Sequence, residues 1–286
     1  MRGRSWILTL TCEDRVGIVA AVTGFLAERE GFILDSQQFA DLATGRFFMR
    51  VEFGRGGDRF TSDTSALAAA FRPTAEEFAL DWSLAESADR PKMVVAVSSG
   101  SHCLNDLLHR QRTNVLAAEI VAVVSNHDRL RDLTEWHGLP FHHLPVSDDR
   151  TGQEAAILRV MAEAGASHLV LARYMQVLST ALTDALAGRC INIHHSFLPG
   201  FKGARPYHRA HERGVKLIGA TAHFVTAELD EGPIIEQAVE RVDHRASVDD
   251  MIRIGRDIEA QVLARAVNWV GERRVLVDGN KTVVFR

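Results

Sequence analysis

The sequence predicts an α/β protein of two units, an N-terminal ferredoxin-like unit and a larger unit built on a mostly parallel sheet. Over the first 86 residues, strand and helix patterns follow one another in the order βαββαβ. From residue 92 onward, short unbroken apolar runs alternate with amphipathic stretches, as in sheets covered by helices on both faces. We therefore expect units at residues 1–86 and 92–286, joined by a polar linker at 87–91 that ends in Pro91.

The first unit shows two different periods along the chain. Alternating apolar and polar residues predict strands at residues 5–12, 32–39, 46–53 and 78–84. Apolar residues at the helical period predict helices at residues 18–26 and 62–71. At the start of the first helix, we expect Asp14 to cap the helix and Gly17 to let it pack closely on the sheet.

The second unit repeats a strand-then-helix pattern. Strands are expected at residues 93–98, 119–125, 141–144, 168–171, 190–194, 217–225 and 234–242. Helices are expected at residues 103–110, 130–137, 153–164, from 180 onward and at 247–270, the last capped by Ser247 with Asp250. Runs at 275–277 and 282–285 around Asp278-Gly279-Asn280 predict a terminal hairpin.

The composition is that of an ordinary globular protein, with 46% apolar and 24% charged residues over 286 positions. A net charge of −4 gives no general basic field, so no nucleic-acid partner is expected. The chain shows no signal-peptide pattern and no apolar stretch of membrane-spanning length, so we expect no membrane partner. Three cysteines, Cys12, Cys103 and Cys190, lie in or beside apolar runs without zinc-site spacing, which favours reduced thiols and a cytoplasmic location.

The stretch from Cys190 to Pro199 is the strongest candidate for chemistry. It begins as an apolar strand, and alternation places Asn192 and His194 on one face. A carboxamide beside an imidazole offers a neutral hydrogen-bond donor next to a group that carries a proton near neutral pH. This pair suits a carbonyl whose oxygen becomes negative during attack. The alternative interpretation is a strand end whose polar groups only satisfy a loop.

Other polar segments are expected at the same sheet edge, because parallel sheets bind ligands beyond the carboxyl ends of their strands. The loop at 174–178 follows one strand, and the acidic loop at 226–232 carries Asp230. The turn from Ser98 to His102 lacks the G-x-G-x-x-G phosphate pattern of dinucleotide-binding folds, so no nicotinamide or other nucleotide cofactor is expected.

Two motifs in this order resemble the formyltransferase fold that uses 10-formyltetrahydrofolate. They are Asn192-Ile193-His194, and the stretch from Thr221 to Val225 followed by Asp230-Glu231-Gly232-Pro233. The resemblance runs from about residue 93 to 237 and implies a Rossmann-like formyltransferase domain. It implies that Asn192, His194 and Asp230 are catalytic. It also implies a folate slot formed by Arg173, Tyr174, Met175, Gln176, Val177, Leu178, Thr226, Ala227 and Glu228. For Glu228, a solvated loop charge is the alternative.

Over nearly its whole length the chain resembles the formyltetrahydrofolate deformylases. The matching runs are 102–108, Ser125-Asn126-His127, 193–199 and 201–207. The sequence departs from that family at Ser99, where a lysine is more usual. Residues 11–19 resemble the opening of an ACT domain, a regulatory module that often binds amino acids and pairs with a second copy. The resemblance implies a homo-oligomer, dimer or tetramer, and an amino-acid effector near Asp14, Arg15, Gly17 and Ile18.

The deformylase resemblance implies hydrolysis of 10-formyltetrahydrofolate to formate and tetrahydrofolate, which supplies formate for purine biosynthesis and balances one-carbon folate pools. Asn192 and protonated His194 would donate to the oxyanion, each donor contributing about 3–4 kcal/mol. Asp230 would hold the imidazolium and take a proton from water. We expect His195 to help hold that water, His223 to support His194 or Asp230, and residues 202–205 to close the pocket.

Three further interpretations stay open from the sequence. A formyltransferase would use the same three residues with an amine acceptor in place of water. A non-catalytic amino-acid sensor would have kept only the fold. The pair His142-His143 raises the question of a metal, but no acidic or cysteine partner has ligand spacing, so we expect a strand-end pair and no metal site.

Overall fold

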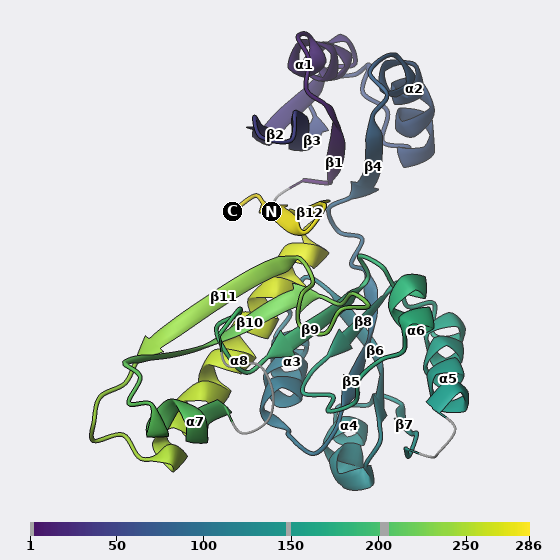
Figure 1. Ribbon diagram of the computed structural model, residues 1–286. Helices are drawn as coiled ribbons and strands as arrows, with labels where there is room; N and C mark the ends of the chain where they lie inside the picture. Colours follow the sequence, from purple (N-terminus) through teal and green to yellow (C-terminus); the bar gives the residue numbers. More distant parts are fainter. Residues whose placement is uncertain (1–2, 147–149, 201–205) are drawn as a thin grey trace. The chain divides into compact units, whose positions relative to one another are not determined.

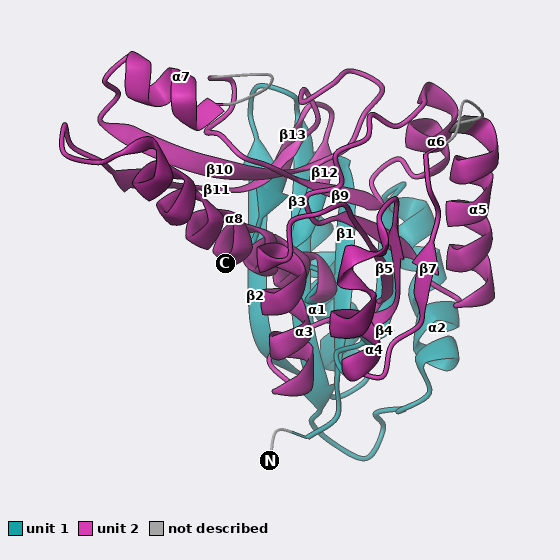
Figure 2. Ribbon diagram, turned by 90° about the horizontal axis from the view of Figure 1, so that it is seen from below, with its two compact units in different colours: residues 1–90, 272–276, 283–286 teal, residues 91–271, 277–282 magenta. Residues whose placement is uncertain are grey.

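The computed structural model describes residues 3–146, 150–200 and 206–286. The chain divides into two compact units (Figure 2). Unit 1 comprises the described residues up to Arg90 together with 272–276 and 283–286, and unit 2 comprises 91–271 and 277–282. The C-terminal segments therefore contribute to both units.

Unit 1 is a four-stranded antiparallel sheet with two helices packed on it (Figure 1). Its elements are β1 Ser5–Glu13, α1 Ile18–Glu28, β2 Gly31–Asp41, β3 Arg46–Arg55, α2 Thr64–Glu77 and β4 Asp81–Glu86. The strand order β2-β3-β1-β4 is that of a ferredoxin-like unit, and the predicted βαββαβ order is confirmed. Leu8, Ile18, Val22 and Phe71 belong to one buried core that the sheet shares with both helices.

Three local predictions in unit 1 are wrong. Asp14 does not cap α1, because Gly17 occupies the N-cap position at φ +102° and no side chain caps the helix. The nearest atom to a Cβ on Gly17 would be 3.6 Å away in the Phe78 ring, so this glycine is needed for its φ and not for close packing. Helix α2 continues through Pro73 because buried Ala75 packs in the core, and β4 consequently begins at Asp81.

Unit 2 is organised around a seven-stranded sheet in the order β11-β10-β9-β8-β5-β6-β7. The strands are β5 Lys92–Val97, β6 Glu119–Ser125, β7 Phe141–His143, β8 His168–Leu171, β9 Cys190–His194, β10 Leu217–Phe224 and β11 Ile234–Arg241. The five strands from β9 to β7 are parallel, whereas β10 and β11 are antiparallel to their neighbours. The predicted mostly parallel sheet is confirmed. Its parallel strands all end at one edge.

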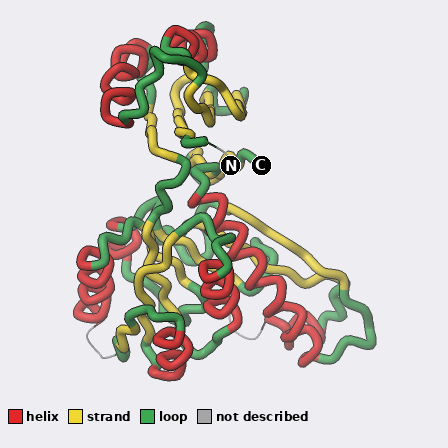
Figure 3. The backbone as a smooth tube through the Cα atoms, turned by 180° about the vertical axis from the view of Figure 1, so that it is seen from behind, coloured by secondary structure: helices red, strands yellow, loops and turns green. Residues whose placement is uncertain are grey.

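Helices cover both faces of this sheet (Figure 3). They are α3 His102–Arg112, the short 3-10 helix η1 Asp128–Leu130, α4 Arg131–Trp136, α5 Arg150–Glu163, α6 Thr180–Ala185, α7 Pro206–Glu212 and α8 Val248–Gly271. Helices α5 and α6 share a core with β5, β6 and β8, while α8 packs against α3 and strands β9 to β11. The predicted cap of α8 is present, since Ser247 Oγ accepts from Asp250 N and Asp250 Oδ2 accepts from Ser247 N, both at 3.1 Å.

Two features complete the fold. The predicted terminal hairpin is formed by β12 Val275–Asp278 and β13 Lys281–Val284, with Gly279 at φ +58° in its turn. Cys12, Cys103 and Cys190 are buried free cysteines. Within the described residues, every helix is too short or too polar to cross a membrane.

Candidate active site

A cavity of about 530 Å³ opens at the carboxyl edge of the unit 2 sheet, where the ends of β8 and β9 meet the loop after β10. All nine residues predicted to form the folate slot line this cavity, together with Asn192, His194, His195, His223 and Asp230. The loop after β8 is tied to the end of β5, because Met175 N donates to Ser98 Oγ at 2.9 Å and Ser98 in turn donates to Asn126. The loop after β8 and the loop after β10, which are far apart in the sequence, therefore both form walls of this cavity.

The pair His194–Asp230 lies in this cavity and is well buried. His194 Nδ1 is 3.1 Å from Asp230 Oδ1, with side-chain exposures of 7% and 10%. The hydrogen bond from His194 is the main cause that lowers the pKa of Asp230, so this carboxylate stays ionised. Because Nδ1 donates to Asp230, Nε2 is the ring nitrogen that is available to a ligand. His194 Nε2 is buried and has no hydrogen-bond partner among the described residues.

The backbone of the acidic loop explains how Asp230 reaches His194. Asp230 adopts φ +59°, a left-handed conformation that aspartate tolerates better than most residues. A Cβ on Gly232 would lie 1.7 Å from the carbonyl oxygen of Phe224, so only glycine fits where the loop returns to β11. The motif Asp230-Glu231-Gly232 is thus built by local backbone requirements as well as by chemistry.

Asn192 is oriented by His223, which lies across from it on the neighbouring strand β10. Asn192 Nδ2 is 3.2 Å from His223 Nε2, and His223 Nδ1 is 2.9 Å from the carbonyl oxygen of Phe224. Burial lowers the pKa of His223, so its ring is neutral. Since Nδ1 must donate to the carbonyl, Nε2 accepts from Asn192, and one amide hydrogen of Asn192 stays available for a ligand.

We call Asn192, His194, His223 and Asp230 the His194 cluster. The predicted supporting residue His223 therefore contacts Asn192 directly, and its Nε2 lies farther from Asp230 Oδ1, at 3.9 Å. The cluster brings a neutral amide donor, an imidazole nitrogen and a carboxylate to one wall of the cavity. Such a set can stabilise a developing oxyanion and move a proton.

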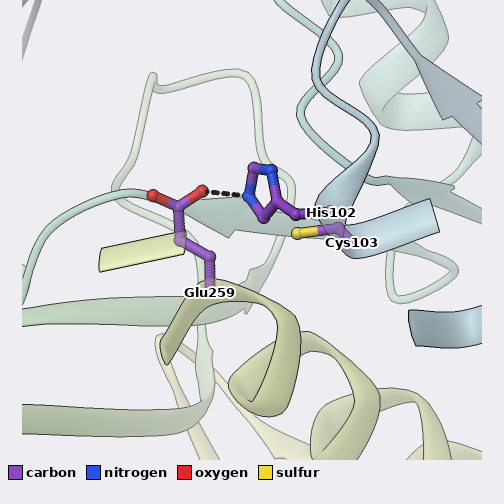
Figure 4. A group of neighbouring side chains, drawn as sticks. All are labelled: His102, Cys103 and Glu259. Atoms are coloured by element: carbon purple, nitrogen blue, oxygen red, sulfur yellow. Dashed lines mark hydrogen bonds and ion pairs between the residues drawn. The ribbon is translucent and has the colours of Figure 1, made fainter. Parts of the chain in front are cut away.

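His195 belongs to a second set of polar side chains, which the sequence did not predict as a group. Its ring stacks on that of His194, with centroids 4.7 Å apart and an interplanar angle of 19°. Arg173 Nη1 is 2.5 Å from His195 Nδ1, and Arg173 Nε is 3.3 Å from Glu259 Oε2. Glu259 lies in α8 and is 2% exposed. Its carboxylate also accepts from Tyr207 Oη at 2.8 Å. It accepts from His102 Nε2 at the same distance, and Figure 4 marks this contact with a dashed line.

We call His102, Arg173, His195, Tyr207 and Glu259 the His195 cluster. Burial raises the pKa of Glu259, but the hydrogen bond from His102 and the charge of Arg173 outweigh burial and leave that pKa below its ordinary value. Glu259 is therefore an anion, paired with the guanidinium. A signal for it existed in the sequence. A glutamate one residue after Ile258, within the buried stripe of a long helix, needs a partner.

His102, Cys103 and Glu259 raise the question of a metal, because one ligand atom from each lies within 4.8 Å of the others (Figure 4). Metal binding needs the thiolate, yet burial raises the pKa of Cys103 well above its usual value. The carboxylate of Glu259 already accepts two hydrogen bonds, from Tyr207 and His102, and is paired with the guanidinium of Arg173. These contacts describe a hydrogen-bonded ion pair.

Other predicted residues lie elsewhere. Residues 202–205, expected to close the pocket, fall outside the described part of the chain. The predicted effector residues lie in unit 1, where Arg15 stacks on the Phe78 ring and Ile18 is a core residue at 2% exposure. The Ile18 side chain is therefore enclosed by the core of that unit.

Known proteins share the sequence and the fold of this chain. The formyl transferase family profile matches residues 91–267, which defines the class of the catalytic unit. The formyltetrahydrofolate deformylase of Corynebacterium sp. (strain P-1) is 50% identical over 98% of each chain. The crystal structure of a formyltetrahydrofolate deformylase from Pseudomonas syringae pv. tomato matches with a TM-score of 0.95 and 49% identity, covering 99% of this chain and 95% of the other. The chain therefore belongs to the formyltetrahydrofolate deformylase family, a family of hydrolases.

A transferase structure matches over a shorter length. Glycinamide ribonucleotide transformylase 1 from Symbiobacterium toebii is 29% identical with a TM-score of 0.64, covering 69% of this chain and 95% of that one. The deformylase match in contrast extends through both units. Family membership and the two-part fold predicted from the sequence are thus confirmed.

Proposed function

We propose that this chain hydrolyses 10-formyltetrahydrofolate to formate and tetrahydrofolate, with Asn192, His194 and Asp230 as its catalytic residues. The observation that carries the proposal is the His194 cluster in a cavity of about 530 Å³, in a chain 50% identical to a deformylase over nearly its full length. The folate lies against residues 173–178 and 226–228, which line the same cavity. Tyr174 stays a neutral phenol there, because burial raises its pKa to about 12.

The proposed reaction begins with attack of water on the formyl carbon, and the water proton passes to Asp230. The free amide hydrogen of Asn192 and a proton on His194 Nε2 stabilise the oxyanion that forms, each donor contributing about 3–4 kcal/mol. When the carbon–nitrogen bond breaks, His194 gives its Nε2 proton to the leaving nitrogen. Asp230, 3.1 Å from Nδ1, sustains the imidazolium until Asp230 takes the water proton.

The direct test is incubation of the full chain with 10-formyltetrahydrofolate in the absence of any amine, with formate and tetrahydrofolate both measured. We expect the two products in equal amounts, and no change when a phosphoribosyl amine is added. The alternative is a formyltransferase with the same catalytic residues. Loss of the formyl group only when an amine is present, with no formate in its absence, would select that alternative.

Further parts of the proposal use the same assay. We propose that the reaction needs no metal, so dialysis against a chelator should leave formate release unchanged. We propose that unit 1 is an ACT domain that binds an amino-acid effector near Asp14, Arg15 and Gly17. We also propose that the chain forms a dimer or tetramer. One of the common amino acids should therefore change the rate of formate release. No response to any of them, or a monomeric mass in light scattering, would contradict that part. The formate released would serve purine biosynthesis in the cytoplasm.

A further inference from the structure

Glu259 is a buried carboxylate for which the proposed reaction has no direct use. It is 2% exposed in α8, and it carries a charge because its pKa is lowered. The helix makes room for its partner one turn earlier. A Cβ on Gly255 would lie 2.0 Å from Tyr207 Oη, the hydroxyl that donates to Glu259 Oε1. An anion that is built into the core in this way must be balanced by a specific cation.

That cation is Arg173, and its second contact reaches the cavity. Arg173 holds Glu259 Oε2 through Nε at 3.3 Å and His195 Nδ1 through Nη1 at 2.5 Å. Arg173 stands at the end of β8 with φ +65°, a left-handed conformation that is unfavourable for a long side chain. The contacts at both ends of the guanidinium offset this backbone strain.

The contact with Arg173 determines which ring nitrogen of His195 carries the proton. A guanidinium only donates hydrogen bonds, so Nδ1 of His195 must be the acceptor. The neutral ring therefore carries its proton on Nε2. The same contact aligns the ring with that of His194, on which it stacks at 4.7 Å.

The side chain of His195 lies between two cavities. It lines the catalytic cavity, and it also lines a second, largely apolar cavity of about 350 Å³ bounded by Phe197, Tyr207 and Leu217. The hydrogen bond from Arg173 and the stacking on His194 both orient the ring at the wall of the catalytic cavity.

We propose that Glu259 is a positioning residue that acts through Arg173 to hold His195 as a neutral ring, protonated on Nε2, for ordering the attacking water. This inference rests on the proposed hydrolysis, and it assigns to the His195 cluster the task of keeping a second positive charge away from His194. A protonated His195 would stack a cation on the His194 imidazolium, which disfavours the charged form of both rings.

The first test is Glu259→Gln, which keeps the shape of the side chain and removes its charge. Without its anion, Arg173 no longer stays fixed on Nδ1, and the proton of His195 is no longer confined to Nε2. We expect kcat for formate release to fall about tenfold with KM changed less than about twofold, as for a misplaced reacting group. We also expect a new loss of activity as the pH falls, absent from the double variant Glu259→Gln/His195→Asn.

The matched control is Glu236→Gln, the same substitution at another buried glutamate, 5% exposed on β11 and outside the catalytic cavity. It should leave kcat and the pH profile as in the unchanged protein. If Glu259→Gln and Glu236→Gln both lower only the unfolding midpoint, Glu259 is purely structural and the inference is wrong.

The second test is made on the unchanged protein and uses a variant only to assign the signal of His195. Long-range 1H–15N NMR of histidine-labelled full chain reports which ring nitrogens carry protons, with His195 assigned by its absence from His195→Asn. We expect a neutral ring protonated on Nε2 across about pH 6 to 8. A ring protonated on Nδ1, or doubly protonated near pH 6.5, would overturn the inference. If the unchanged protein released no formate while the NMR result held, the proposed function would fail independently.

Discussion

Two neighbouring histidines on one strand end are coupled to carboxylates in opposite ways. In the His194 cluster, Asp230 contacts the ring directly, with 3.1 Å between Oδ1 and Nδ1. In the His195 cluster, Arg173 lies between the ring and Glu259, with Nη1 at 2.5 Å from Nδ1. The two rings stack at 4.7 Å, so neither can change its charge without affecting the other.

The difference shows how two identical side chains can take different proton states. A carboxylate against Nδ1 stabilises the imidazolium, because it accepts the Nδ1 hydrogen and balances the charge. A guanidinium against Nδ1 occupies the acceptor and leaves no site for a second proton. His194 is thereby suited to donate and receive a proton, and His195 to stay neutral beside it.

The largest expected effect comes from breaking the first coupling. His194→Ala and Asp230→Asn should each lower kcat for formate release by about a hundredfold or more, because each removes an acid–base partner. Circular dichroism should show retained folding. The control is Asp243→Asn, an exposed aspartate paired with Arg245. A folded Asp230→Asn that matches this control would remove Asp230 from the reaction.

A smaller effect is expected from His223, which acts on Asn192. His223→Phe keeps an aromatic ring at this position but loses the acceptor for Asn192 Nδ2, now at 3.2 Å. We expect kcat to fall by about tenfold or more, because the Asn192 amide is no longer directed at the oxyanion. His223→Gln should have a kcat between those of His223→Phe and the unchanged protein, because its carbonyl can accept from Asn192. The matched control is His142→Phe on β7, a strand at the far edge of the sheet. Equal kcat for both phenylalanine variants would show that Asn192 needs no such support.

Much of the His194 cluster could be predicted from the sequence because its parts are local. Asn192 and His194 follow from strand alternation, and Asp230 precedes a glycine that the backbone requires. Parallel pairing of β8 with β9 then brings the loops to one edge. His223 was expected to support His194 or Asp230; it lines the same cavity, and its hydrogen bond is to Asn192.

The His195 cluster could not be predicted, because its contacts join residues far apart in sequence. Arg173 was expected only as part of the folate slot, and its bond to Glu259 spans 86 positions. Helix α7, which carries Tyr207, has seven residues, too few for a helical period to stand out. Periodicity predicted the helix at residues 247–270, but it says nothing about which cation meets a carboxylate on the buried face of that helix.

The smallest expected effect is on stability against acid, and it separates His223 from the two buried carboxylates by pH. Burial lowers the pKa of His223, so the unfolded chain takes up this proton first, and stability is lost as the pH falls below about 6.5. The pKa values of Asp230, lowered mainly by His194, and of Glu259 are below their ordinary values. Their contribution is present above about pH 4 and is lost below it.

The unfolding midpoint should therefore fall in two steps when it is measured by calorimetry from about pH 7.5 to pH 3.5. His223→Phe should flatten the upper step without abolishing it, because burial also lowers the pKa of His137. Asp230→Asn and Glu259→Gln should each flatten the lower step and leave the upper one. If Glu259→Gln left the lower step unchanged, Glu259 would not be ionised in the folded protein, and Arg173 would lack the anion that fixes it on His195.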